Sequence, residues 1–159
     1  MGEYAPTDAT LDATGMRLAV VAGRFNAHVT ERLLEGLQKE LRELGGDEPQ
    51  VWWVPGAFEI PLVAKRLASS GTVDAVICLG AVIRGETAHF EYVAGPCAAG
   101  VSQVALETGI PVIFGVLTTD DDEQALARAG GPEGNKGAEA ARTAVEMVAL
   151  LRTVPAGGT

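Results

Sequence analysis

Short, almost wholly apolar runs alternate with amphipathic segments along this chain. The apolar runs predict strands buried on both faces of a sheet, at residues 17–23, 50–54, 73–83 and 111–118. Apolar residues at helical spacing between and after them predict helices, at residues 29–44, 58–68, 89–108, 122–129 and 136–152. Because strands and helices alternate, we expect parallel strands joined by right-handed crossovers. The expected α/β fold is a three-layer αβα sandwich around a four-stranded parallel sheet, of the flavodoxin-like kind.

Two segments depart from this pattern. Residues 1–15 contain Pro6 and little apolar sequence, so we expect an N-terminal arm that is ordered only if a partner holds it. A single domain would then occupy residues 16–159. Pro96 falls inside the predicted third helix, where we expect it to kink the helix or to delay its regular part.

Composition and charge narrow the classes of function. The chain of 159 residues is 47% hydrophobic and 21% charged, which is typical of one globular domain with its own core. Its net charge of −9 disfavours nucleic acid and anionic membrane as partners. No apolar run approaches the ~20 residues of a membrane span, and the acidic N-terminus does not resemble a signal peptide. Cys78 and Cys97 lack a CxxC partner, so we expect reduced thiols in a cytoplasmic protein.

The stretch Gly80–Tyr92 carries the strongest chemical signal. A buried strand leads through a short glycine-bounded loop to the expected start of a helix, and free N–H groups there make an anion site. His89 lies one step inside that site, where it could move protons on the bound molecule. An ordinary strand-to-helix connection with a solvated histidine explains this segment equally well.

Ligands of an open parallel sheet bind beyond the carboxyl ends of its strands, and this rule also selects the loops around residues 23–26, 55–59 and 118–120. Phe25 could pack on the next helix as a hydrophobic staple or act as a plate for a flat ligand, and its residue type favours the staple. Asn26 is a plausible helix cap. Glu59 suits the first turn of a helix, Phe58 is more typical of a core, and His28 of a solvated surface.

Three basic residues are notable in so acidic a chain: Arg84, Arg128 and Lys136. Arg128 ends a short predicted helix, where positive charge is favourable, and Lys136 lies in a glycine-flanked turn. The chain has no P-loop, no GxGxxG pattern, no metal-ligand spacing and no nucleophile elbow. We therefore predict neither a cofactor nor a metal.

Six motifs occur in a fixed order from about residue 16 to the end of the chain. They are Arg24-Phe25-Asn26 with Val29-Thr30, GAFEIP at 56–61, GAVIRG at 80–85 with Thr87 and His89-Phe90, VIFGVLTT at 112–119, EQAL at 123–126 with Arg128-Ala129-Gly130, and Asn135-Lys136-Gly137. In these motifs the chain resembles the 6,7-dimethyl-8-ribityllumazine synthase family of riboflavin biosynthesis. The third motif is close to diagnostic.

The resemblance implies a transferase that condenses 5-amino-6-(D-ribitylamino)uracil with 3,4-dihydroxy-2-butanone 4-phosphate, releasing phosphate and water without a metal or organic cofactor. It implies that Phe25 stacks on the pyrimidine ring, and that other residues hold the ribityl chain and the ring edge: Ala57, Phe58 and Glu59 for the chain, and Ala81, Val82 and Ile83 for the edge. His89 would carry protons. Phe114 of a neighbouring subunit would close the ring pocket.

The phosphate would lie at the helix N-terminus, bound by Gly85, Glu86 and Thr87. The resemblance adds Arg128 from the neighbouring subunit and positive charge from Lys136. Because Glu86 brings a carboxylate to this place, its contact would be made through the backbone N–H. Glu91 stands where the family commonly has Asp.

The resemblance also implies a homo-oligomer with active sites at subunit interfaces, a pentamer and more specifically an icosahedral 60-mer. The compact turn at residues 129–137 leaves contact between pentamers unobstructed. Two alternatives stay open: an archaeal-type riboflavin synthase, and a non-catalytic lumazine-binding shell protein. Thr87 and Arg128 argue against the first, which needs no phosphate clamp, and His89 with Arg128 argues against the second.

Overall fold

The computed structural model describes residues 3–157 as four long strands, two short strands, five α-helices and one 3-10 turn. The strands are β1 (Leu18–Gly23), β2 (Gln50–Val54), β3 (Ala75–Ile83), β4 (Val112–Thr119), β5 (Ala129–Gly131) and β6 (Gly134–Asn135). The helices are α1 (Ala27–Glu43), α2 (Ile60–Ala68), α3 (His89–Thr108), α4 (Asp122–Ala127) and α5 (Lys136–Leu151), and the 3-10 turn η1 (Ala57–Glu59) precedes α2.

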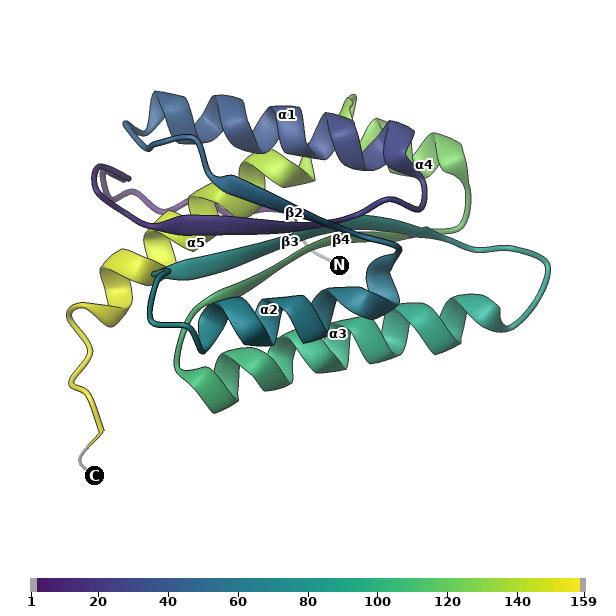
Figure 1. The fold of residues 1–159 in the computed structure, drawn as a ribbon. Coiled ribbons are helices and arrows are strands. Elements are labelled where there is room, and N and C mark those ends of the chain that lie inside the picture. Colours follow the sequence, from purple (N-terminus) through teal and green to yellow (C-terminus); the bar gives the residue numbers. More distant parts are fainter. Residues whose placement is uncertain (1–2, 158–159) are drawn as a thin grey trace.

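The four long strands form one parallel sheet in the order β2-β1-β3-β4. This is the flavodoxin-like order without a fifth strand. Figure 1 shows helices on both sides of the sheet, so the predicted three-layer αβα sandwich is confirmed. Eight of the nine residues of β3 are buried, because both faces of this central strand are covered.

Each face of the sheet has its own apolar core. Helices α1 and α5 cover one face, where Leu33, Leu37 and Val145 are fully buried against the strands. Helices α2 and α3 cover the other, with Ile60 and Val101 among the buried residues. The helical stripes seen in the sequence therefore correspond to the sides that face the sheet.

The carboxyl ends of all four strands lie at one edge of the sheet, at the right of Figure 1. Four connections gather at this edge: residues 24–26, 55–56, 84–88 and 120–121. The parallel topology thus brings together the loops that the sequence singled out.

Three details differ from the sequence-based expectation. Helix α3 runs without interruption from His89 through Pro96, so the predicted delay of its regular part is wrong. The short helix predicted at residues 122–129 ends at Ala127. Strands β5 and β6 then form an antiparallel hairpin that the sequence pattern did not indicate, because glycines provide no alternation of side chains.

The described part of the N-terminal arm, residues 3–15, contains no helix or strand. Its end packs on α1: Ala13 is fully buried and its N–H donates to the carbonyl of Leu44 at 2.8 Å. Residues 1 and 2 lie outside the described residues. That a partner orders the arm, and that the domain begins at residue 16, stay predictions.

Both cysteines are unpaired and buried. Burial raises the pKa of the Cys97 thiol to about 11, and raises that of Cys78 further. A thiol with so high a pKa is a poor nucleophile, which indicates a packing role for both residues. Within residues 3–157, no helix has the length and apolar character needed to cross a membrane.

Candidate active site

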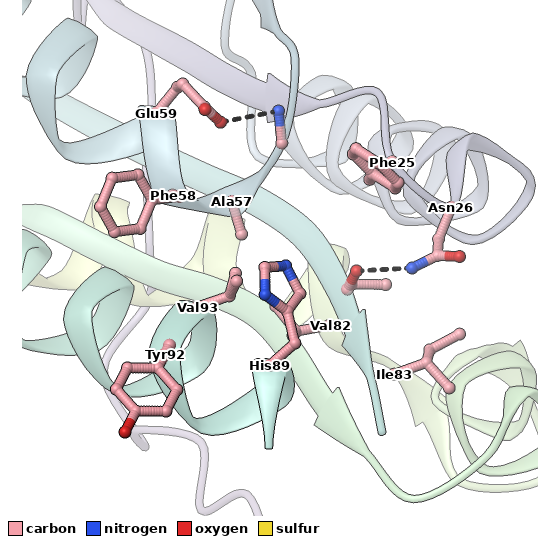
Figure 2. A pocket seen from close by; sticks show the side chains of 12 residues that line it. Phe25, Asn26, Ala57, Phe58, Glu59, Val82, Ile83, His89, Tyr92 and Val93 are labelled. Atoms are coloured by element: carbon pink, nitrogen blue, oxygen red, sulfur yellow. Dashed lines mark hydrogen bonds between the residues drawn. The ribbon is translucent and has the colours of Figure 1, made fainter. Parts of the chain in front are cut away.

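A pocket of about 590 Å³ lies at the carboxyl ends of β1, β2 and β3, beside the first turn of α3. It brings together residues from four separate parts of the sequence (Figure 2). Eight of the residues expected at the site line it: Phe25, Ala57, Phe58, Glu59, Ala81, Val82, Ile83 and His89. A pocket of this size fits a small organic molecule.

Phe25 presents its aromatic ring to the pocket. The residue is 74% exposed, so it is not the buried staple that its residue type favoured. Its backbone N–H donates to the carbonyl of Pro55 at 3.1 Å, which ties the end of β1 to the end of β2. Any Cβ at Gly56 would lie 3.2 Å from the ring, so a glycine there lets the ring approach the backbone closely.

Asn26 has a different role from the helix cap that we expected. It occupies the N-cap position of α1 in the left-handed conformation, with φ 58° and ψ 44°, and its side chain makes no capping hydrogen bond. Its Nδ2 instead donates to the carbonyl of Ala81 at 2.9 Å. The β1–β3 pairing ends earlier, at Ala22 and Leu79, so the Asn26 amide extends the connection between these strands by a side chain.

Glu59 and Phe58 both belong to the turn η1. One oxygen of Glu59, Oε2, accepts the N–H of Gly56 at 3.1 Å, which holds the carboxylate at the pocket and leaves Oε1 for a ligand. Phe58 is 58% exposed and lines the pocket, so the expectation that it is a core residue is wrong.

His89 is the first residue of α3, and its side chain is exposed to the pocket. Figure 2 shows its ring at the centre, with Ala57, Val82 and Val93 around it. Among residues 3–157 no group forms a hydrogen bond with either ring nitrogen of His89, so both are available to a ligand. This placement suits a group that transfers protons within the pocket.

The loop before His89 is exposed and packs against little of the chain. Residues 85–88 are exposed, and a Cβ added to Gly85 would meet no atom of the described chain within 4 Å. The Thr87 hydroxyl accepts the N–H of His89 at 3.3 Å, whereas the N-cap residue Ala88 provides no side-chain cap. The remaining N–H groups at the start of α3 can therefore bind an anion.

Comparison with known proteins decides the family. The family model of 6,7-dimethyl-8-ribityllumazine synthase matches residues 15–152. Two curated proteins of that name, from two strains of Thermus thermophilus, are each 60% identical over 146 residues, covering 91% of this chain and 93% of the relative. The chain belongs to the 6,7-dimethyl-8-ribityllumazine synthase family. The motifs quoted above therefore reflect common descent.

Some residues expected from the family lie outside this pocket. Phe114 is half-buried on β4 and packs with the core between the sheet and α2–α3. Arg128 is exposed at the end of α4, where its Nη1 donates to the carbonyl of Gln124 at 3.0 Å. Lys136 begins α5 and its Nζ lies 3.6 Å from Glu139. One chain thus brings together the eight lining residues named above, and Phe114, Arg128 and Lys136 are not among the residues that line the pocket.

The sequence reasoning missed two residues of α3 that line the pocket, Tyr92 and Val93. They lie three and four residues after His89, on the same side of the helix, so helical spacing from His89 could have found them.

The sequence reasoning also missed a contact of His28, which is exposed as expected. His28 Nε2 lies 2.6 Å from Asp122 Oδ1 and connects α1 to α4.

Proposed function

We propose that this protein condenses 5-amino-6-(D-ribitylamino)uracil with 3,4-dihydroxy-2-butanone 4-phosphate, forming 6,7-dimethyl-8-ribityllumazine, phosphate and water. The observation that carries the proposal is the position of His89, at the centre of a pocket in a member of this family. The relatives from Thermus thermophilus carry the corresponding name. The remaining lining residues provide the groups that the first substrate needs.

The pyrimidine would stack on Phe25, since an exposed aromatic face is a good surface for a flat heteroaromatic ring. Backbone groups at the end of β3, from Ala81 to Ile83, would bind the ring edge. The ribityl chain would extend along η1, where Ala57 and Phe58 provide contact area and the Oε1 atom of Glu59 accepts hydrogen bonds from its hydroxyls.

The phosphate of the second substrate would bind at the start of α3, through backbone N–H groups of Gly85, Glu86 and Thr87. A helix N-terminus favours an anion through its free N–H groups and its dipole. Within the described part of the chain no Lys or Arg lines the pocket, so we propose that Arg128 and Lys136 of a neighbouring subunit add the positive charge. An Arg fork on a phosphate is a strong, charge-assisted contact.

His89 would accept and return protons as the amine attacks the carbonyl, water leaves to form the Schiff base, and phosphate is eliminated. Each of these steps moves a proton near neutral pH, which suits an imidazole. Holding both substrates together would supply much of the acceleration. The chemistry proposed needs no metal or cofactor.

We also propose a homo-oligomer, at least a pentamer and further an icosahedral 60-mer, in the cytoplasm. The family site is shared between neighbours, and Phe114 of one subunit would close the ring pocket of the next. Large exposed apolar side chains support assembly. Leu62 on α2 is 72% exposed and Leu106 on α3 is 84% exposed, and both would become buried between subunits. Light scattering on the purified protein tests the size, and a monomer active at low concentration would contradict a shared site.

A turnover assay with the two substrates tests the function, followed by the absorbance and fluorescence of the product. We expect formation of the lumazine and release of phosphate, both dependent on each substrate. Conversion of lumazine alone into riboflavin, without turnover of the phosphorylated butanone, would contradict the proposal and indicate a riboflavin synthase.

A further inference from the structure

Arg84 directly follows the last residue of β3 and precedes the loop of residues 85–88. Its backbone N–H donates to the carbonyl of Thr119 at 2.8 Å, at the end of β4. Its guanidinium contacts two carboxylates, with Nη1 2.6 Å from Glu91 Oε1 and Nε 3.1 Å from Asp120 Oδ1. The same group lies over the ring of Phe90, 4.4 Å from its centroid. One side chain therefore connects three segments at the edge of the pocket.

The contact between Arg84 and Glu91 spans the loop from one end to the other. Arg84 precedes the loop, whereas Glu91 lies in the first turn of α3, two residues after His89. Within the loop, the only side-chain hydrogen bond among the described residues is the one from the His89 N–H to Thr87. The middle of the loop is therefore held mainly from its two ends, and Arg84 joins these ends.

The first turn of α3 is also held by Phe90, the residue directly after His89. A guanidinium over an aromatic face is attracted to it, and the planar shape of the group fixes its orientation. Asp120, which follows β4, braces the other side of the guanidinium. Rotation of this helical turn would break these contacts together, so they hold the backbone from which the His89 side chain extends.

The charge of Arg84 is already partnered. Two carboxylates face the guanidinium, and its hydrogen bond to Glu91 holds the pKa of that carboxyl below its usual range. A phosphate approaching Arg84 would have to compete with both carboxylates. This arrangement suits a residue that organises the loop better than one that binds the phosphate directly.

We propose that Arg84 is a positioning residue, and that its contacts with Glu91, Asp120 and Phe90 hold the loop of residues 85–88 and the first turn of α3 in the geometry needed for phosphate binding and proton transfer. The proposal rests on the proposed function, because it assigns phosphate binding to this loop and proton transfer to His89. It adds two residues, Arg84 and Glu91, that act without touching the substrate.

Steady-state kinetics of Arg84→Gln and Glu91→Gln test the proposal. We expect KM for the phosphorylated butanone to rise and kcat to fall by about 10- to 100-fold, since displacements of about 1 Å at a reacting centre have effects of this size. Product affinity should change little, because Phe25 and Glu59 are untouched. Arg84→Lys should retain part of the activity, since an ammonium keeps the charge but cannot form the fork.

Arg17→Gln is the matched control. Arg17 makes a comparable contact with Asp74, at 2.9 Å, before β1 at the opposite edge of the sheet. We expect Arg84→Gln and Arg17→Gln to have similar melting temperatures, and only Arg84→Gln to have altered kinetics. Equal kinetic constants in these two variants would overturn the proposal.

The double variant separates positioning from direct binding. If Arg84 acts through Glu91, the combined substitution should be about as impaired as Arg84→Gln alone, because residues in one network are not additive. If Arg84 bound the phosphate itself, Glu91→Gln alone would leave KM unchanged or lower it. Adding Arg84→Gln to that variant would then raise KM by the full amount seen for Arg84→Gln alone. That outcome would overturn the proposal.

Amide hydrogen exchange provides a readout independent of turnover. Arg84→Gln should accelerate exchange in a peptide covering residues 85–91, whereas Arg17→Gln should not. If the wild-type protein failed to turn over the two substrates, the proposed function would fall, and accelerated exchange would still support the contact network. Unchanged exchange in this peptide would overturn the network even if turnover were confirmed.

Discussion

Replacing Phe25 with alanine should weaken binding of the pyrimidine and of the product much more than it destabilises the fold. Phe25 is 74% exposed, so only about a quarter of its surface is covered within its own chain. Truncating a fully buried Phe costs about 3–5 kcal/mol, and a quarter of this is roughly 1 kcal/mol. We therefore expect a small fall in melting temperature.

The expected loss of affinity is larger, because a stacked ligand covers one face of the ring. An aromatic side chain buries about 150–250 Å² in full, and one face of the exposed part corresponds to roughly 60–90 Å². At about 25 cal/mol per Å², this area contributes roughly 1.5–2.3 kcal/mol. Stacking adds about 0.5–1.5 kcal/mol. The sum of about 2–4 kcal/mol corresponds to a product affinity about 30- to 700-fold lower.

A product titration by fluorescence, paired with a melting curve, measures both quantities on the same sample. Phe25→Leu is the control, since it keeps apolar contact and removes the flat ring, and we expect it to recover part of the affinity. A large fall in melting temperature with unchanged product affinity would refute the stacking role and restore the staple.

Three further substitutions test other parts of the site. His89→Ala should slow condensation by about 10²- to 10⁴-fold while leaving a residual rate from substrate alignment, and an unchanged kcat across neutral pH would exclude His89 as the proton carrier. Arg128→Ala should raise KM for the phosphorylated butanone and leave pyrimidine affinity nearly unchanged in a titration; equal losses for both substrates would indicate a structural role. Asn26→Gly keeps the left-handed backbone accessible and removes the hydrogen bond from the side-chain amide to the carbonyl of Ala81. We expect weaker product binding at a nearly constant melting temperature, and unchanged product binding would contradict a role of Asn26 in shaping the pocket.

The sheet and its helices were predictable because their signal is local. Apolar runs and helical stripes indicated the order of the elements, and the parallel topology then placed the right loops at one edge. The β5–β6 hairpin could not be predicted in this way, since its residues include Gly130, Gly131 and Gly134 and have no alternating pattern. The unbroken course of α3 through Pro96 likewise depends on packing that a local rule does not include.

Part of the candidate site could likewise be predicted from the sequence, and part could not. The rule that ligands bind beyond the carboxyl ends of parallel strands selected the loops that contain Phe25, Glu59 and His89, and all three residues line the pocket. The family resemblance alone decided their individual roles. The bond from Asn26 to Ala81 joins residues 55 positions apart, and that from Arg84 to Asp120 joins residues 36 apart. Contacts between residues so far apart in the sequence follow from the fold as a whole. Residue type alone therefore suggested a helix cap for Asn26, and for Arg84 only a notable positive charge in an acidic chain.

The central claim is that lumazine forms at a site shared by neighbouring subunits, and mixing two impaired variants tests it most directly. His89→Ala and Arg128→Ala chains would be co-assembled in equal amounts, and turnover measured at a low concentration of the phosphorylated butanone. In a randomly mixed ring, about a quarter of the interfaces would combine an intact His89 with an intact Arg128, so activity should rise to about a quarter of the wild-type value. Activity no higher than the average of the two separate variants would contradict the shared site.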